Sequence, residues 1–137
     1  MSNKQDSAFL QHLMDFNVVP IVIFNTDGRM LSVNDAFLDL IGYSREDMDA
    51  GRVNWRDLTP PEYLPVDEYF VEQLKHSLII QPYVKEYVRK DGSRVAIQLF
   101  NGRDPRTPAR GWPSSWRSES AGRLMMQHEV KDLKTWL

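Results

Sequence analysis

The chain has 137 residues, a formal net charge of -2 and no cysteine. This length fits one domain of ordinary size. The small net charge provides no field that favours nucleic acid or an anionic membrane, and the lack of cysteine excludes disulfides, thiolate metal sites and cysteine nucleophiles. The N-terminus lacks the apolar core of a signal peptide, and no apolar run is long enough to span a membrane. We therefore expect a cytoplasmic protein.

The N-terminal segment predicts a short amphipathic helix. Phe9, Leu13 and Phe16 recur at the i, i+4 and i+7 positions and so share one face. A helix this short is marginal alone and needs a surface on which to dock. The stripe is therefore either the seam of a homodimer or a contact with the protein's own sheet.

The next residues predict a β-hairpin. Val18 to Phe24 is an apolar run rich in branched side chains, which is typical of a strand. Asn25 to Gly28 supplies the turn, with a glycine that can adopt a positive φ. Arg29 to Val33 is predicted as the return strand.

The middle of the chain predicts several helices. Asn34 is a favourable N-cap and Gly42 a favourable C-terminal stop. Ser44 and Asp47 have the spacing of a capping box, with a shorter acid than usual. A longer helix is predicted from Pro65 to about Ser77, because its apolar residues repeat every fourth position.

A second pair of strands follows this helical middle. Tyr83 to Arg89 and Arg94 to Phe100 both alternate, and Lys90 to Ser93 is a strong hairpin turn between them. Strand pairs around a helical middle predict an α+β fold, in which helices cover one face of an antiparallel sheet.

Four motifs, in their order and spacing, resemble a bacterial PAS domain. They are TDG at Thr26 to Gly28, VNDAF at Val33 to Phe37, GYS at Gly42 to Ser44, and RKDGS at Arg89 to Ser93. The resemblance covers about residues 12–100. It implies a sheet closed by one more, central strand, and a sensory module that is not an enzyme. It also implies signal transduction, as in two-component systems, with a histidine kinase or another output domain as partner.

The C-terminal part departs from the family pattern. Residues 101–123 contain no Ile, Leu, Val, Phe, Tyr or Met, so they cannot form a buried central strand. We therefore expect the final central strand to be missing or replaced, and we predict that this stretch is read out of frame. The alternative is a genuine basic or disordered tail. Residues 123–137 allow an amphipathic helix.

These observations divide the chain into three parts. Residues 1–17 are a flanking helix, residues 18–100 are the PAS core, and residues 101–137 are an atypical tail that is partly disordered or non-native. Homodimerisation is expected through the N-terminal helix.

The resemblance also suggests a ligand pocket on the concave face of the sheet, although the same residues would simply fill the core of a small domain. The candidate lining residues are Phe24, Phe37, Leu40, Trp55, Phe70, Leu74, Val88, Ile97 and Leu99. No metal site or catalytic residue is predicted.

The sequence gives no positive indication of a particular cofactor. Haem is not expected, because Leu64 to Asp67 matches the ligand-bearing stretch of haem-binding relatives and holds no histidine. A flavin–cysteine adduct is excluded by the missing cysteine.

Two other functions stay open at this point. One is a small α+β cone-fold enzyme or carrier for an apolar molecule, which would require a buried Asp, Glu or His near the pocket; the sequence indicates none. The other is nucleic-acid contact by the basic tail, through Arg103, Arg106, Arg110 and Arg117 with Trp112 and Trp116.

Overall fold

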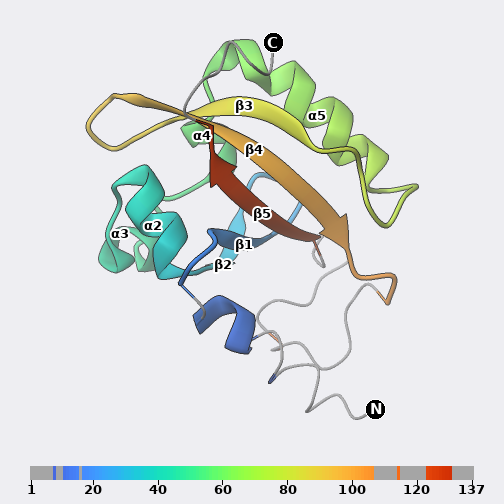
Figure 1. The fold of residues 1–137 in the computed structure, drawn as a ribbon, viewed down its shortest axis with the longest axis horizontal. Helices are drawn as coiled ribbons and strands as arrows, with labels where there is room; N and C mark the ends of the chain where they lie inside the picture. Colours follow the sequence, from blue (N-terminus) through green and yellow to red (C-terminus); the bar gives the residue numbers. More distant parts are fainter. Residues whose placement is uncertain (1–7, 9–10, 16, 107–113, 115–122, 131–137) are drawn as a thin grey trace.

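The computed structural model describes residues 8, 11–15, 17–106, 114 and 123–130. One antiparallel sheet has the strand order β2-β1-β5-β4-β3 (Figure 1). The strands are β1 (Ile21–Phe24), β2 (Met30–Val33), β3 (Tyr83–Val88), β4 (Arg94–Arg103) and β5 (Arg123–Glu129). Between β2 and β3 come α2 (Asp35–Ile41), α3 (Arg45–Asp49), α4 (Trp55–Leu58), η1 (Pro61–Tyr63) and α5 (Leu64–Gln73). The predicted α+β class and both hairpins are confirmed.

The expected loss of the central strand is wrong. β5 pairs with β1 on one side and β4 on the other, so residues 123–129 form the central strand and not a helix. Burial alternates along β5, with Arg123, Met125 and Gln127 facing the core. Two of these three inward residues are polar. The sequence of this strand therefore lacks the alternation of apolar and polar residues by which a half-buried strand is recognised. The predicted reading-frame error falls largely on residues outside the described part of the chain.

The main core lies between the helices and the concave face of the sheet. Its fully buried members include Phe24, Phe37, Ile41, Leu74 and Ile97. Phe37 meets Tyr87 edge-to-face, with ring centroids 5.9 Å apart. These contacts hold the helices against strands that come from both ends of the chain.

A second, smaller cluster covers the opposite face of the sheet. Met14, in the helical turn at residues 11–15, is buried with Ile21 and Ile23 of β1, and Leu13 packs against the same group. Leu13 thus docks on the protein's own sheet, one of the two options for the N-terminal stripe. Phe9 and Phe16 lie outside the described residues.

Local capping confirms the predicted boundaries of the short helices. The Asn34 side chain accepts hydrogen bonds from the backbone N–H groups of Phe37 and Ile21, at 3.1 and 3.0 Å. It therefore caps α2 and ties that helix to β1. Ser44 and Asp47 form the reciprocal capping box of α3.

Helix α5 ends earlier than the sequence predicts. α5 ends at Gln73, because the following N–H groups bond three residues back: Lys75 to Glu72 and His76 to Gln73. Such 3₁₀-type turns tighten the chain and stop the helix before Ser77. Within the described residues, no helix has the length and apolarity needed to cross a membrane.

Candidate functional site

The predicted lining residues, except Val88, lie in the main core or pack against it. Trp55, Ile97 and Leu99 are each at most 2% exposed, so they fill the interior. Val88 lies on the other face of β3 from Lys85 and Tyr87, which are buried while Val88 is half-buried. The structure therefore brings the set together without Val88.

A buried ion pair lies on this concave face, at the edge strand β3. Asp67 of α5 and Lys85 of β3 are in direct contact through Oδ2 and Nζ, and their side chains are 2% and 1% exposed. The pair joins the longest helix to an edge strand of the sheet. Burying both charges carries a large desolvation penalty unless further hydrogen bonds satisfy them.

Those further hydrogen bonds come from neighbouring elements. Lys85 Nζ donates to Thr59 Oγ1 at 2.7 Å, and the Thr59 hydroxyl lies 2.6 Å from the carbonyl oxygen of Trp55, to which it donates. The Tyr83 hydroxyl donates to Asp67 Oδ1 at 2.8 Å. The cluster of Asp67, Lys85, Tyr83 and Thr59, called the ionic cluster below, therefore links α4, α5 and β3.

Aromatic rings surround the ammonium group. Lys85 Nζ lies 4.6 Å from the centroid of the Tyr87 ring and 5.8 Å from that of Trp55. Both distances allow cation–π attraction, which strengthens when water is excluded. The cluster thus combines a charged centre with an apolar wall, the combination typical of small-molecule sites.

The pKa values of the cluster show the effect of burial. Burial lowers the pKa of Lys85 to about 8, against the opposing attraction of Asp67. Burial, and then the Asp67 carboxylate, raise the pKa of Tyr83 well above its ordinary value. At neutral pH the Lys85 amine is therefore protonated and the Tyr83 phenol neutral. The ammonium group donates to Thr59 and Asp67, and the phenol donates to Asp67.

Sequence reasoning missed this cluster. The sequence indicates no buried acid near the pocket, so Asp67 is not among the predicted site residues. The available signal was the alternation that places Tyr83, Lys85 and Tyr87 on one face of β3. That pattern does not say which face is buried, because the other face carries two valines.

Asn101 on β4 and Gln127 on β5 are further polar side chains on the concave face. The Oδ1 of Asn101 and both amide atoms of Gln127 are buried without a hydrogen-bond partner among the described residues. Asn101 is 4% exposed and Gln127 1%. Buried polar atoms are nearly always hydrogen-bonded, so these atoms are unusual polar positions in a mostly apolar interior.

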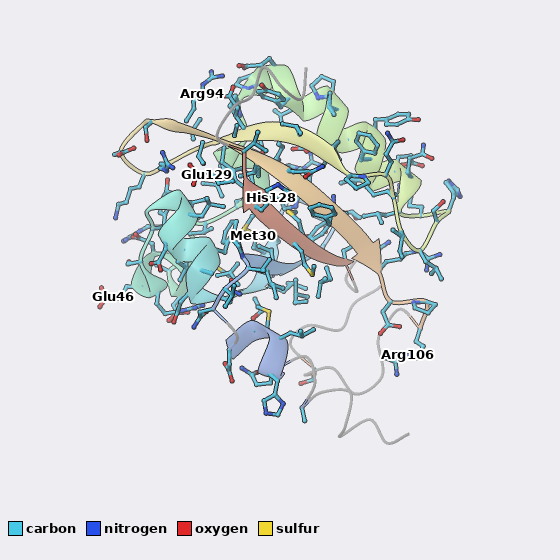
Figure 2. All side chains as sticks on the ribbon, in the orientation of Figure 1. Met30, Glu46, Arg94, Arg106, His128 and Glu129 are labelled. Atoms are coloured by element: carbon cyan, nitrogen blue, oxygen red, sulfur yellow. The ribbon has the colours of Figure 1, made fainter. Side chains whose placement is uncertain are left out.

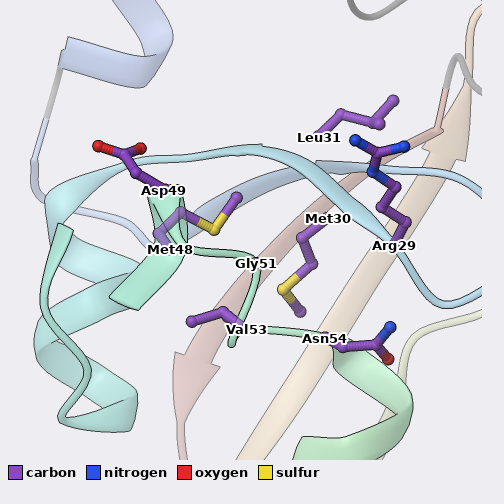
Figure 3. A pocket seen from close by; sticks show the side chains of 8 residues that line it. All are labelled: Arg29, Met30, Leu31, Met48, Asp49, Gly51, Val53 and Asn54. Atoms are coloured by element: carbon purple, nitrogen blue, oxygen red, sulfur yellow. The ribbon is translucent and has the colours of Figure 1, made fainter. Parts of the chain in front are cut away.

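A hollow of about 570 Å³ lies at the surface away from this cluster. It borders the edge strand β2 and is lined by Met30 and Met48 (Figure 3). Its charged residues, Arg29 and Asp49, lie on opposite sides of it. Because acid–base chemistry needs groups that converge, this hollow offers no catalytic pair.

Side chains that could bind a metal ion or a haem iron do not cluster in the part of the chain that the structure describes. It holds no group of three or more His, Asp or Glu that could bind a metal ion. His12, His76 and His128 are all exposed, and His128 lies on the outer face of β5 beside Phe100 (Figure 2). The concave face therefore presents no axial histidine for haem.

Comparison with known proteins relates the chain to signalling proteins. The hybrid signal transduction protein dokA of Dictyostelium discoideum is 39% identical over 79 residues, which cover 57% of this chain and 5% of that protein. The C4-dicarboxylate transport sensor protein DctS of Rhodobacter capsulatus is 27% identical over 117 residues, covering 82% and 17%. The chain thus spans a small fraction of each relative's length.

Solved structures share the fold at low sequence identity. A PAS domain from a two-component sensor histidine kinase matches with a TM-score of 0.64 at 14% identity, covering 90% of this chain and 95% of the other. A Rhodobacter sphaeroides LOV protein matches with a TM-score of 0.69 at 17% identity, covering 96% and 69%. The family profile described as PAS domain matches residues 18–102. The chain therefore belongs to the PAS domain family, whose members serve in sensory signal transduction.

Proposed function

We propose that this PAS domain binds a small polar molecule at the concave face of its sheet and passes the signal to an output domain. The observation that carries the proposal is the ionic cluster, in which Lys85 and Asp67 are buried among aromatic rings. Buried ion pairs contribute little net stability compared with apolar side chains, and a switch is one of their best-attested uses. A ligand with an acidic or hydrogen-bonding group would compete for the same partners.

The cluster offers a route by which binding would change the fold. Asp67 lies on α5, and both of its carboxylate oxygens are held by β3, through Lys85 and Tyr83. A ligand that takes over either partner releases part of this attachment, so α5 would shift relative to the sheet. The kinase and sensor relatives support a histidine kinase core or a similar output domain as the receiver of that signal. We assign the domain no catalytic step.

The test is native mass spectrometry of freshly purified wild-type protein beside the double variant Asp67→Leu/Lys85→Met. This variant removes both charges together, so it leaves no unpaired buried charge and is expected to fold. Wild type should retain a small molecule that the double variant lacks. The exposed variant Lys90→Met, the matched control, should retain it. A wild-type protein without a bound molecule, or equal retention by the double variant, would contradict the proposal.

A second candidate function is homodimerisation through the outer face of the sheet. Phe100 and Met126 are paired in register there and are 38% and 37% exposed, next to Leu124 and the docked Leu13. The same mass spectra report the oligomeric state. Phe100→Glu should convert a dimer to a monomer, whereas Val66→Glu, at an exposed position on α5, should not. A wild-type monomer at all protein concentrations would contradict this function.

A further inference from the structure

Two consecutive residues of α4 hold the turn between β1 and β2. Trp55 donates its backbone N–H to the carbonyl oxygen of Gly28 at 3.1 Å, and its indole N–H to that of Asn25 at 3.3 Å. Arg56 Nη2 donates to the carbonyl oxygen of Thr26 at 3.2 Å. Because α4 binds three carbonyl oxygens of this turn, the turn and the helix form one unit.

The side chain of Arg56 also packs closely on the turn. A β-carbon placed at Gly28 would lie 2.8 Å from Arg56 Cδ, closer than non-bonded carbon atoms approach in proteins. Glycine at this position therefore lets the arginine lie directly against the backbone. The guanidinium carbon lies 4.6 Å from the centroid of the Trp55 ring, so cation–π attraction holds the other end of the side chain in place.

The guanidinium group of Arg56 reaches α5 as well. Its Nη1 lies 2.8 Å from Glu68 Oε1, and both side chains are partly exposed. Glu68 directly follows Asp67, whose carboxylate is held by Lys85 and Tyr83. This part of α5 is therefore attached twice, to β3 through the ionic cluster and to the β1–β2 turn through Arg56.

Helix α4 also contacts the ionic cluster directly. Thr59 Oγ1 donates to the carbonyl oxygen of Trp55 at 2.6 Å and accepts from Lys85 Nζ at 2.7 Å. The Trp55 ring packs edge-to-face on Phe24, the last residue of β1, with ring centroids 6.3 Å apart. α4 thus connects the ionic cluster with the end of β1 that enters the turn.

Strand β1 connects this turn to the opposite face of the sheet. Ile21 and Ile23 of β1 form the small cluster on that face, and Met14 of the N-terminal helical turn is buried with them. A displacement of β1 would therefore move the surface on which the N-terminal segment packs.

We propose that Trp55 and Arg56 couple the state of the ionic cluster to the N-terminal segment. When the attachment of Asp67 to β3 changes, α5 moves, and α4 passes the movement to the turn and along β1 to Met14. Packed elements switch between discrete arrangements, so a small shift at one site is carried to another. The inference rests on the proposed function in one respect, that the ionic cluster is the part that changes. Arg56 is a positioning residue, because it acts through Glu68 and the turn.

The test is a double-mutant cycle read by NMR at the amide and methyl signals of Met14. The variant Asp67→Leu/Lys85→Met changes the ionic cluster without leaving an unpaired charge in the core, so the test needs no ligand. This variant should shift the Met14 signals, which lie on the other face of the sheet and so report transmission. With Arg56→Leu added to both proteins, that shift should fall by about half or more, because coupled sites are not additive.

Two further variants sharpen the cycle. Arg56→Lys keeps the positive charge and an apolar stem, so it should restore part of the response that Arg56→Leu loses. Arg94→Leu is the matched control, since Arg94 is also a partly exposed arginine paired with glutamate, but its partners lie on η1 and β3. It should leave the shift at Met14 unchanged.

Three results would overturn the proposal. An equal shift with and without Arg56→Leu would show that the sheet alone carries the coupling. Met14 signals that do not respond to Asp67→Leu/Lys85→Met would show that there is no coupling to carry, and an equal reduction by Arg94→Leu would remove the specific role of Arg56. None of these results depends on a bound molecule, so failure of this coupling and failure of ligand retention in the mass spectra are distinguishable.

Discussion

Two clusters in this domain each contain a buried carboxylate paired with one or two positively charged side chains. They differ in how far those positively charged side chains are buried. In the ionic cluster, the Asp67 and Lys85 side chains are 2% and 1% exposed. At the start of α3, the Asp47 side chain is 5% exposed, but its partners Lys90 and Arg52 are 55% and 68% exposed. The same pairing chemistry therefore operates in two environments.

The difference shows which physical effect dominates in each place. Burial lowers the pKa of Lys85 even though a carboxylate touches it. At Asp47, the hydrogen bond from Lys90, with those from Ser44 and Arg52, holds the pKa of the carboxyl well below its usual range. Loss of hydration decides the first case, and attraction decides the second, where the cations keep most of their water.

The largest expected effect comes from removing one partner of the buried pair. Asp67→Asn or Lys85→Met alone should lower the free energy of unfolding by about 3–5 kcal/mol, because each leaves an uncompensated group in the core. Urea denaturation measures this directly. The double variant Asp67→Leu/Lys85→Met should recover most of the loss. A single variant that loses less than about 1 kcal/mol, as exposed pairs do, would remove the distinction between the two clusters.

A smaller effect is expected in alkaline solution. The pKa of Lys85 is about 8 in the folded protein and 10.5 in its ordinary state, so the unfolded chain binds more protons between these values. The contribution of Lys85 to stability is therefore lower below pH 8 and increases as the pH rises toward about 10. Above that range the raised pKa values of Tyr83 and Tyr87 act in the opposite direction.

This pH dependence is measured by urea denaturation at a series of pH values. The comparison is wild type against the double variant, which lacks the titrating amine. The free energy of unfolding of wild type should increase relative to that of the double variant as the pH rises from about 8 to about 10. Parallel profiles would mean that the Lys85 amine is not desolvated in the folded protein.

Local signals explain why most of the fold was predictable. Asn34 caps α2 and Gly42 ends it with φ 76°, and both residues act on their immediate neighbours. The hairpin turns at Gly28 and Gly92 have φ 103° and 87°, which glycine adopts without strain. Each of these features depends on a few adjacent residues, so the sequence carries it without knowledge of the tertiary structure.

The missed features depend on distant partners. β5 is central because β1 and β4 pair with it, whereas its own inward residues Arg123 and Gln127 are polar. Asp67 and Lys85 are eighteen positions apart, and each alone has the character of a surface residue. Only the packing of α5 against β3 buries them together, and no local pattern predicts that contact.

The smallest expected change concerns the exposed partner of Asp47. Lys90→Gln removes the strongest of the interactions that lower the Asp47 pKa, so this pKa should rise toward its ordinary value of 3.8 while Ser44 and Arg52 still hold it below. A carboxyl group whose pKa is lower in the folded than in the unfolded protein stabilises the fold at pH values above its unfolded-state pKa. This stabilisation is lost as the pH falls toward the folded-state pKa. Wild type should therefore lose more stability than Lys90→Gln on acidification below about pH 4. Titration of the Asp47 carboxyl carbon by NMR measures the pKa in both proteins. An unchanged value would show that water screens Lys90 completely, and Asp47 would then be held by Ser44 and Arg52 without a contribution from Lys90.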